Sequence, residues 1–390
     1  MATNSNFIVK NGLIVGNTAV IGVANTISTS NITGAMTISG GLGVRGNVAA
    51  DMIVFPDGTT QGTASAGGTV GPRNKIINGN MVIDQRNEGA VVTAGSSYTL
   101  DRWNVDLVWS GSTVTVQRSS SAPGGSGFAN SMFVTVSTGA AVSSANYFSI
   151  QQFIEGYNIM DLELGSATPQ SFTVSFWVRS SVTGTYGIGF RNSDFTLSYW
   201  TTYTVIYANT WERKVVTVTG SGTALGAWYK TNSYGLNLIF SLGCGSTNKA
   251  TSNNSWNVSN SLGAIGQTDL ITTTGAIFAL TGVQLEKGTT ATSFEYRPYV
   301  VELQLCQRYY QIINRTANRA LYSSYGSSFN WSLWQFKVTM RSSPTIAGAG
   351  QGLLEGSTPD FATRYSAGNA YASFGYNGST YAPATATAEL

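Results

Sequence analysis

The run SFTVSFWV, residues 171–178, places Phe172, Val174, Phe176 and Val178 at every second position. Side chains alternate across a β-strand, so these four residues are expected to share one buried face. Period-two runs of the same kind, broken by Gly or Asn, recur at SMFVTV (131–136), RKVVTVTG (213–220), GLNLIFSLG (235–243) and IFALTGVQLE (277–286). Many short alternating strands between turn residues predict an all-β fold, with a β-sandwich over residues 71–300.

Charged residues are scarce, and this limits the classes of partner that the protein is expected to bind. Asp, Glu, Lys and Arg make up 10% of the 390 residues, against about 25% in ordinary soluble domains. Ser, Thr, Asn and Gly must supply the polar surface, which suits a protein outside cells or in a particle. The net charge is +3 with no basic run, and no apolar stretch is long enough to cross a bilayer. We therefore expect neither nucleic-acid binding nor membrane insertion, and the N-terminal MATNSNFIVKNG does not resemble a secretory signal.

The sequence has no histidine, which excludes Ser-His-Asp and Cys-His triads and zinc sites that use imidazole. Carboxylate chemistry and calcium remain open, although no spaced Asp/Asn loop of the EF-hand kind is present. We expect no metal and no cofactor. The two cysteines, Cys244 and Cys306, allow at most one intrachain bridge; two buried free thiols are favoured, consistent with assembly in a reducing cytosol.

Composition divides the chain into three parts. Residues 1–70 are glycine-rich and contain a weak repeat, GLIVGN (12–17) and GLGVRGN (41–47). Such thin strands bury a core only if three copies share one axis, so a trimeric shaft or attachment segment is predicted; a disordered leader is the alternative. The Gly/Ser/Thr-rich segment 62–74 marks a boundary.

The region after the sandwich, residues 301–390, is predicted to be a short linker followed by a distal β tip. Within YVVELQLCQRYYQII (299–313), Pro298 and the four-residue spacing of Val301, Leu305 and Tyr309 favour a helical turn, followed by a strand from Tyr309. A strand through Val301 is the alternative. Residues 314–390 have few aliphatic side chains and are expected to pack on neighbouring copies of the chain.

Six segments resemble those of bacteriophage tail-fibre and receptor-binding proteins. They are NKIINGNMVIDQRNEG (74–89), YTLDRWNV (98–105), QQFIEG (151–156), SFWVRSS (175–181), GVQLEKGTTATSFEYRP (282–298) and ELQLCQRYYQ (302–311). The strands containing SFWVR and NTWERKVVTV, and the last strand before QLEKG, are also similar to those of jelly-roll carbohydrate-binding modules. The N-terminal repeat is similar to repeats in virion proteins of marine phages, particularly cyanophages.

This resemblance implies a homotrimeric tail fibre of the virion, assembled in the host cytoplasm. Residues 1–70 would attach to a tail tube, baseplate, nozzle or adaptor protein, and the rest would bind a host surface polysaccharide such as lipopolysaccharide without catalysis. Two alternatives stay open: a polysaccharide depolymerase tailspike, with carboxylates such as Asp161 and Glu163 sharing one face of a strand, and a purely structural fibre or adaptor segment.

Sugar binding needs flat aromatic faces together with hydrogen-bonding side chains. The tail offers several aromatics among Gly, Ser and Asn, and the sandwich offers further tryptophans. The candidate receptor residues are Tyr322, Tyr325, Trp331, Trp334, Tyr365, Tyr371, Tyr376, Trp177, Trp200 and Trp228.

A second group of residues is predicted to be structural. Asp101, Arg102 and Trp103 are typical of a buried ion pair at a strand start. In GVQLEKGTTATSFEYRP, Val283 and Leu285 are expected to face the core, and Gln284 and Glu286 to face outward. Glu295 and Arg297 are expected to pair across one face of a strand, so that these charges close the sandwich or an interface rather than form a catalytic set.

Overall fold

The computed structural model describes residues 72–222, 226–312, 336–347, 358 and 385–390 in full. It also describes the backbone alone of strands at 53–54, 60–61, 313, 325–326, 329–335, 354–357, 361–367 and 384. Two units, 1–68 and 69–390, are distinguished. In the first, β1 (Ile53–Val54) pairs antiparallel with β2 (Thr60–Gln61).

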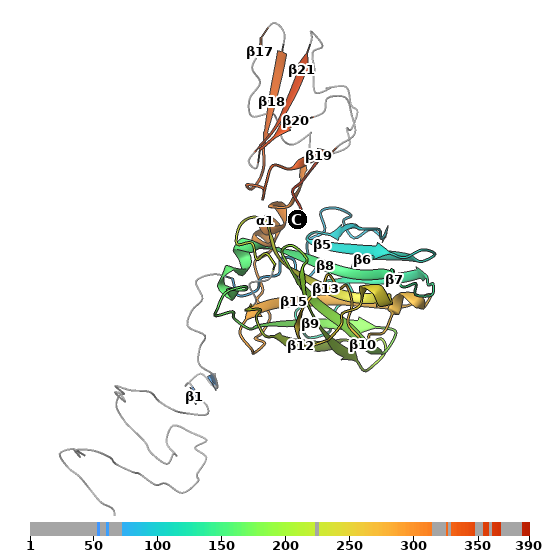
Figure 1. Ribbon diagram of the computed structural model, residues 1–390. Helices are drawn as coiled ribbons and strands as arrows, with labels where there is room; N and C mark the ends of the chain where they lie inside the picture. Colours follow the sequence, from blue (N-terminus) through green and yellow to red (C-terminus); the bar gives the residue numbers. More distant parts are fainter. Residues whose placement is uncertain are drawn as a thin grey trace, which may run out of the picture. The chain divides into compact units, whose positions relative to one another are not determined.

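Two antiparallel sheets form the body of the second unit (Figure 1), which confirms the all-β sandwich. The seven-stranded sheet has the order β14-β11-β10-β13-β8-β5-β4 and comprises β4 (Ser97–Leu100), β5 (Trp103–Val108), β8 (Tyr147–Glu155), β10 (Gly184–Asn192), β11 (Leu197–Val205), β13 (Tyr234–Cys244) and β14 (Trp256–Val258). The six-stranded sheet has the order β12-β9-β15-β7-β6-β3 and comprises β3 (Val92–Thr93), β6 (Thr113–Ser119), β7 (Ser131–Thr138), β9 (Phe172–Ser180), β12 (Glu212–Val218) and β15 (Ile277–Lys287). The chain passes repeatedly from one sheet to the other, in a jelly-roll-like manner.

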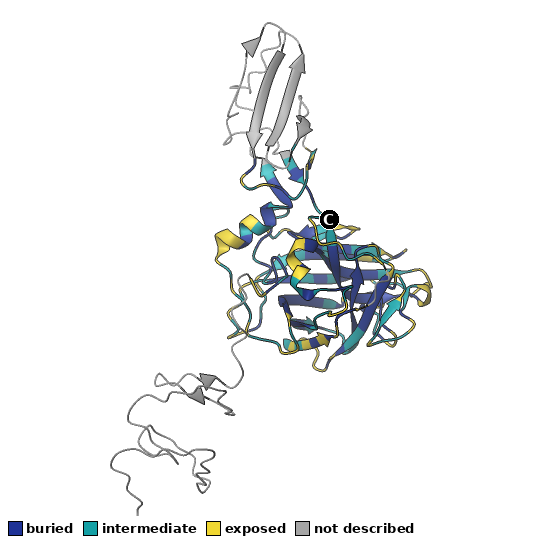
Figure 2. Cartoon of the chain, turned by 60° about the vertical axis from the view of Figure 1, so that its left-hand side comes forward, coloured by how far each residue is buried: buried dark blue, intermediate teal, exposed yellow. Residues whose placement is uncertain are grey.

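The alternation in β9 has the predicted consequence. Phe172, Val174, Phe176 and Val178 are fully buried between the sheets. Phe176 meets Phe240 of β13 edge to face, with ring centroids 5.0 Å apart. Burial of each such side chain contributes about 1.5–3 kcal/mol to stability. The interface between the sheets, whose strands are largely buried in Figure 2, is therefore the main source of stability.

A second apolar cluster lies on the other face of the seven-stranded sheet, where the segment after β13 covers Trp200, Ile239 and Cys244. The remaining short elements are three 3-10 helices: η1 (Gly156–Leu162), η2 (Ser246–Asn248) and η3 (Leu270–Thr272). Within the part of the chain that the structure describes, no helix has the length and apolar character needed to cross a bilayer.

The segment after the sandwich begins as predicted, with a helix and then a strand. α1 (Tyr299–Gln307) starts directly after Pro298, and β16 (Tyr310–Ile313) follows. β16 joins β22 (Ala384–Thr387) and β19 (Thr345–Ala347), while β17 (Tyr325–Gly326), β18 (Phe329–Gln335), β21 (Phe361–Ala367) and β20 (Leu354–Ser357) form a four-stranded sheet. Cys306 lies on the buried side of α1 and packs with Ile77, Ile83 and Tyr309; both cysteines are buried and free, which confirms that prediction.

Candidate functional site: an aromatic pocket on the six-stranded sheet

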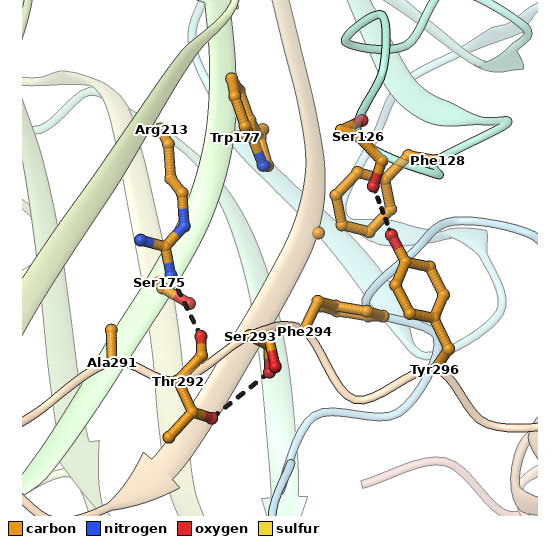
Figure 3. A pocket seen from close by; sticks show the side chains of 11 residues that line it. Ser126, Phe128, Ser175, Trp177, Arg213, Ala291, Thr292, Ser293, Phe294 and Tyr296 are labelled. Carbon is orange, nitrogen blue, oxygen red and sulfur yellow. Dashed lines mark hydrogen bonds between the residues drawn. The ribbon is translucent and has the colours of Figure 1, made fainter. Parts of the chain in front are cut away.

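A pocket of about 400 Å³ lies on the face of the six-stranded sheet that points away from the sandwich core (Figure 3). Its floor comes from β9, where Ser175 and Trp177 alternate with the buried Phe176 and Val178. Ser175 is buried, whereas the Trp177 side chain is only partly covered. Because side chains alternate along the strand, Phe176 and Val178 point into the core, whereas Ser175 and Trp177 point outward and form the floor of the pocket.

A β-bulge in β15 shapes the centre of the pocket. The register with β9 shifts between Thr281 and Gln284, and Gly282 within the bulge has φ +61°. A Cβ atom on Gly282 would lie 2.5 Å from Phe128 Cζ and 3.1 Å from Trp177 Cδ1. Glycine is thus required both by the left-handed backbone and by the close approach of the two rings.

The segment NKIINGN (74–80) runs beside this bulge and forms hydrogen bonds with it. Asn74 Nδ2 donates to the carbonyl of Val283 at 3.2 Å, and Asn74 Oδ1 accepts from the amide of Leu285 at 3.1 Å. The amide of Val283 donates to the carbonyl of Gly79 at 2.9 Å. Backbone groups that lose strand partners at the bulge therefore keep hydrogen bonds, and the pocket geometry is held by buried contacts.

Three rings form one wall of the pocket. Phe128 contacts Phe294 edge to face with centroids 4.9 Å apart, and the Tyr296 ring lies 5.5 Å from Phe128 and 5.0 Å from Phe294. The Tyr296 hydroxyl donates to the carbonyl of Ser126 at 2.6 Å. Burial raises the pKa of Tyr296, so this hydroxyl remains a proton donor at neutral pH. The wall joins loop 121–130 to loop 289–298, which are far apart in sequence.

The opposite wall is polar. Arg213 of β12 is the cross-strand partner of Trp177, and its Nη2 donates to the carbonyl of Thr292 at 3.2 Å. Ser175, Thr292 and Ser293 add hydroxyl groups to the lining. In Figure 3 the Arg213 guanidinium points toward Ser175 and Thr292, away from the aromatic wall formed by Phe128, Phe294 and Tyr296. One face of a small ligand would therefore meet rings and the other would meet hydrogen-bond donors.

Glu286 and Gln284 correct one expectation from the sequence. Both are buried rather than turned to solvent, because loop 289–295 folds over them. Glu286 accepts hydrogen bonds from the Thr292 amide at 2.8 Å, from Thr292 Oγ1 at 2.7 Å and from Gln284 Nε2 at 2.9 Å. Glu286 thus anchors the loop that carries the polar wall.

Glu295 and Arg297 do pair, at 3.7 Å between Oε2 and Nη2, but the prediction that they lie on a strand is wrong. Glu295 accepts from the amide of Asn74 at 2.9 Å. Arg297 donates to the carbonyls of Asn74 and Ile76 and pairs with Glu302 of α1 at 3.4 Å. These charges hold loop 289–298 and α1 against the segment that supports the bulge.

Asp101, Arg102 and Trp103 are all buried, but Asp101 and Arg102 do not form the expected pair with each other. Asp101 accepts from the Gln85 amide at 2.6 Å and from Gln85 Nε2 at 2.9 Å. Desolvation raises the pKa of Asp101 to about 6, against the lowering effect of the Gln85 hydrogen bonds. Arg102 pairs instead with Glu389 and lies over the ring of Tyr309, so it binds the last residues of the chain to the sandwich.

Among the candidate aromatic residues whose side chains the structure describes, Trp177 alone lines the pocket. Trp200 is fully buried in the second apolar cluster, and Trp228 packs on the core beside Trp256, with ring centroids 5.4 Å apart. Tyr325, Trp331, Trp334 and Tyr365 lie on strands β17, β18 and β21, where the backbone alone is described, and Trp331 is the register partner of Tyr365. Tyr322, Tyr371 and Tyr376 lie outside the described residues.

The carboxylates considered for hydrolysis are not on a strand. Asp161 lies in η1 and pairs with Lys75 Nζ at 2.9 Å. Glu163 follows η1 with φ 50° and accepts from Thr168 Oγ1 at 2.8 Å. Each carboxylate therefore has its own local partner, and the shared strand face assumed from the sequence does not exist. Among the described residues, no group of acidic and thiol side chains is arranged to hold a metal ion.

Sequence reasoning missed Phe128, Arg213, Gly282, Phe294 and Tyr296. The alternation of Phe294 with Tyr296 and the glycine inside the apolar strand 277–287 were the available signals, because an isolated glycine in a strand often marks a bulge or a close approach. The contribution of Phe128 had no local signal, since it depends on a loop contact across more than 150 residues.

No protein-family model and no curated protein sequence matches the chain. Among solved structures, the enzymatically active domain of tailspike protein 4 of bacteriophage CBA120 is similar at 14% identity and a TM-score of 0.30, covering 55% of this chain and 22% of that one. The family 11 carbohydrate-binding module of Clostridium thermocellum, in complex with a β-1,3-1,4-mixed-linked tetrasaccharide, has 9% identity and a TM-score of 0.27, covering 52% of this chain and 98% of the module.

TmCBM61, in complex with β-1,4-galactotriose, has 11% identity and a TM-score of 0.25, covering 56% of this chain and 100% of that chain. The matched region of the present chain thus spans about a fifth of the tailspike chain and all or nearly all of the two modules. These TM-scores lie below 0.5, so the similarities carry no conclusion about function.

Proposed function

We propose that this protein binds a glycan in the Trp177 pocket. The observation that carries the proposal is the two-sided lining, in which Trp177, Phe128, Phe294 and Tyr296 supply apolar ring surface and Arg213 with three hydroxyl residues supplies hydrogen bonds. A pyranose has the same two-sided character, with C–H groups on its faces and hydroxyls around its edge. Contact with the rings would bury the C–H faces of the sugar, and hydrogen bonds to the polar wall would fix the orientation of the sugar.

The biological setting of the proposal is a phage tail fibre that attaches the virion to a host surface polysaccharide without cleaving it. The ordered segments NKIINGNMVIDQRNEG through ELQLCQRYYQ support this setting. A homotrimer anchored to the tail through residues 1–70 belongs to the same proposal. Three weak pockets on one assembly would raise the avidity for a repetitive glycan surface.

Binding of the full chain to an array of bacterial surface polysaccharides tests this function. Wild-type protein should bind at least one polysaccharide, and Trp177→Ala should abolish that binding while circular dichroism remains unchanged. Tyr207→Ala is the matched control, because Tyr207 is 64% exposed and does not line the pocket. Equal binding by wild type and Trp177→Ala would refute the site.

The same samples address the remaining parts of the proposal. Light scattering should show a trimer, and a stable monomer would contradict that part. Reducing ends released from the bound polysaccharide would contradict adsorption without catalysis and would favour the depolymerase alternative.

A further inference from the structure

Arg213 has no acidic partner in the described part of the chain. Its guanidinium is exposed and donates one hydrogen bond, from Nη2 to the carbonyl of Thr292. A guanidinium carries five N–H donors, so the others have no partner in the described part of the chain and can serve a ligand. Three other arginines of the sandwich, Arg118, Arg179 and Arg191, also donate to neutral oxygens, but Arg213 alone among them lines the pocket.

The carboxylates near the pocket are already bound by other groups. Glu212 pairs with Lys214 Nζ at 2.6 Å and accepts from the amides of Ile206 and Tyr207 at 2.9 Å. Glu286, behind Thr292, has both oxygens engaged by Thr292 and Gln284. Glu295 accepts from two backbone amides and lies beside Arg297. None of these carboxylates pairs with Arg213.

The lining as a whole combines one cation with hydroxyl groups and lacks anionic or amide side chains. Its eleven residues include one charged side chain, Arg213, and no Asp, Glu, Asn or Gln. Hydroxyls of a neutral sugar are donors as well as acceptors, and the carboxylate and amide side chains that accept strongly from them are absent from this lining. A ligand that brings its own anionic acceptor fits this lining better than a neutral sugar does.

From this arrangement we infer that the glycan unit held in the pocket carries a carboxylate, as uronic and ulosonic acids do, and that Arg213 is its counter-ion. The inference rests on the proposed function and narrows its ligand class. The carboxylate would meet the planar guanidinium through two parallel hydrogen bonds, while the ring of the sugar contacts Trp177, the cross-strand partner of Arg213.

Acidic bacterial polysaccharides and their carboxyl-reduced forms provide a matched test, because reduction converts the carboxylate to a hydroxymethyl group and leaves the rest of the glycan unchanged. Wild-type full-length protein should bind acidic polysaccharides and lose this binding on carboxyl reduction. Arg213→Gln should weaken binding roughly ten- to hundredfold, and Arg213→Lys, which keeps the charge without the fork, should lie between the two. Lys230→Gln, which removes an exposed cation outside the pocket, should bind as wild type.

The outcomes separate this inference from the proposed function. Undiminished binding to the carboxyl-reduced polysaccharides, with Trp177→Ala still inactive, would overturn the acidic ligand and leave glycan binding intact. Wild-type affinity in Arg213→Gln would likewise overturn it. Failure of the wild type to bind any polysaccharide, or full binding by Trp177→Ala, would instead overturn the proposed function on which the inference depends.

Discussion

Trp177 on β9 and Arg213 on β12 are direct cross-strand partners, and both line the pocket on the outer face of the six-stranded sheet. The ring and the guanidinium are therefore positioned by the backbone register of two paired strands rather than by a loop. Loops 121–130 and 289–298 add the remaining walls. A site with its ring and cation on a sheet needs little ordering when a ligand binds.

Gly282→Ala should damage both the fold and the pocket. Alanine would have to adopt φ near +61° and place its Cβ 2.5 Å from Phe128 Cζ. We expect the free energy of unfolding in urea to fall by about 2–4 kcal/mol, from the left-handed backbone and the ring clash together. Gly275→Ala is the control, since Gly275 has φ +79° but nothing near its Cβ position, and it should lose only about 1–2 kcal/mol. Equal losses would show that the ring contact is unimportant.

Arg297→Ala should harm stability, whereas Arg213→Ala should not. Removal of the Arg297 guanidinium leaves the carbonyls of Asn74 and Ile76 and the carboxylate of Glu302 without their partner. We expect a loss of about 2–4 kcal/mol in the free energy of unfolding, against at most about 0.5 kcal/mol for the exposed Arg213. Glycan affinity per folded molecule should fall less in Arg297→Ala than in Arg213→Ala, because Arg297 does not line the pocket and acts on it only through loop 289–298. Full stability of that variant with lost binding would reverse the assignment of the two arginines.

Asp101 should make stability depend on pH. Because burial raises its pKa from the ordinary 3.8 to about 6, the folded state holds this proton to higher pH than the unfolded state does. Its contribution to stability is therefore fully present below the unfolded pKa and declines as pH rises through about 6. As the pH rises from about 4 to about 7, the free energy of unfolding of Asp101→Asn should increase by roughly 3 kcal/mol relative to that of the wild type. A difference between the two proteins that stays constant with pH would contradict this account.

Both thiols should be inert in the folded protein. Burial raises the pKa of Cys244 to about 12, and burial also raises the pKa of Cys306 well above its ordinary value. A thiol-specific reagent at about pH 8 should leave native protein unmodified and should modify both cysteines after denaturation without reductant. Rapid native labelling would contradict the burial, and absence of free thiol in denaturant would reveal a disulfide.

The sandwich followed from the sequence because period-two alternation reports a sheet with one buried face. The helix at 299–307 was expected from Pro298 and the four-residue spacing after it, but Val301 is exposed and the buried helix residues are Glu302, Cys306 and Gln307. The same alternation rule failed for Gln284 and Glu286, since β15 is a central strand whose outer face is covered by loop 289–295. Alternation cannot show whether the second face is covered by solvent or by a loop.

Of the pocket residues, the sequence analysis selected Trp177 alone, because it alternates with core residues and had to point outward. Phe128 and Arg213 reach the pocket through loop closure and strand pairing between distant segments, and local sequence carries no record of such contacts. Hydrogen bonds from Asn74 and Glu286 place these loops, although both residues were outside the expected ligand set.

The central claim is best tested by a crystal structure of the intact protein soaked with the polysaccharide fragment that binds most strongly on the array. We predict a sugar ring stacked against Trp177 and bordered by Phe128, with a carboxylate of the ligand bound to the Arg213 guanidinium. A fragment bound elsewhere on the chain, with the Trp177 pocket empty, would contradict the account.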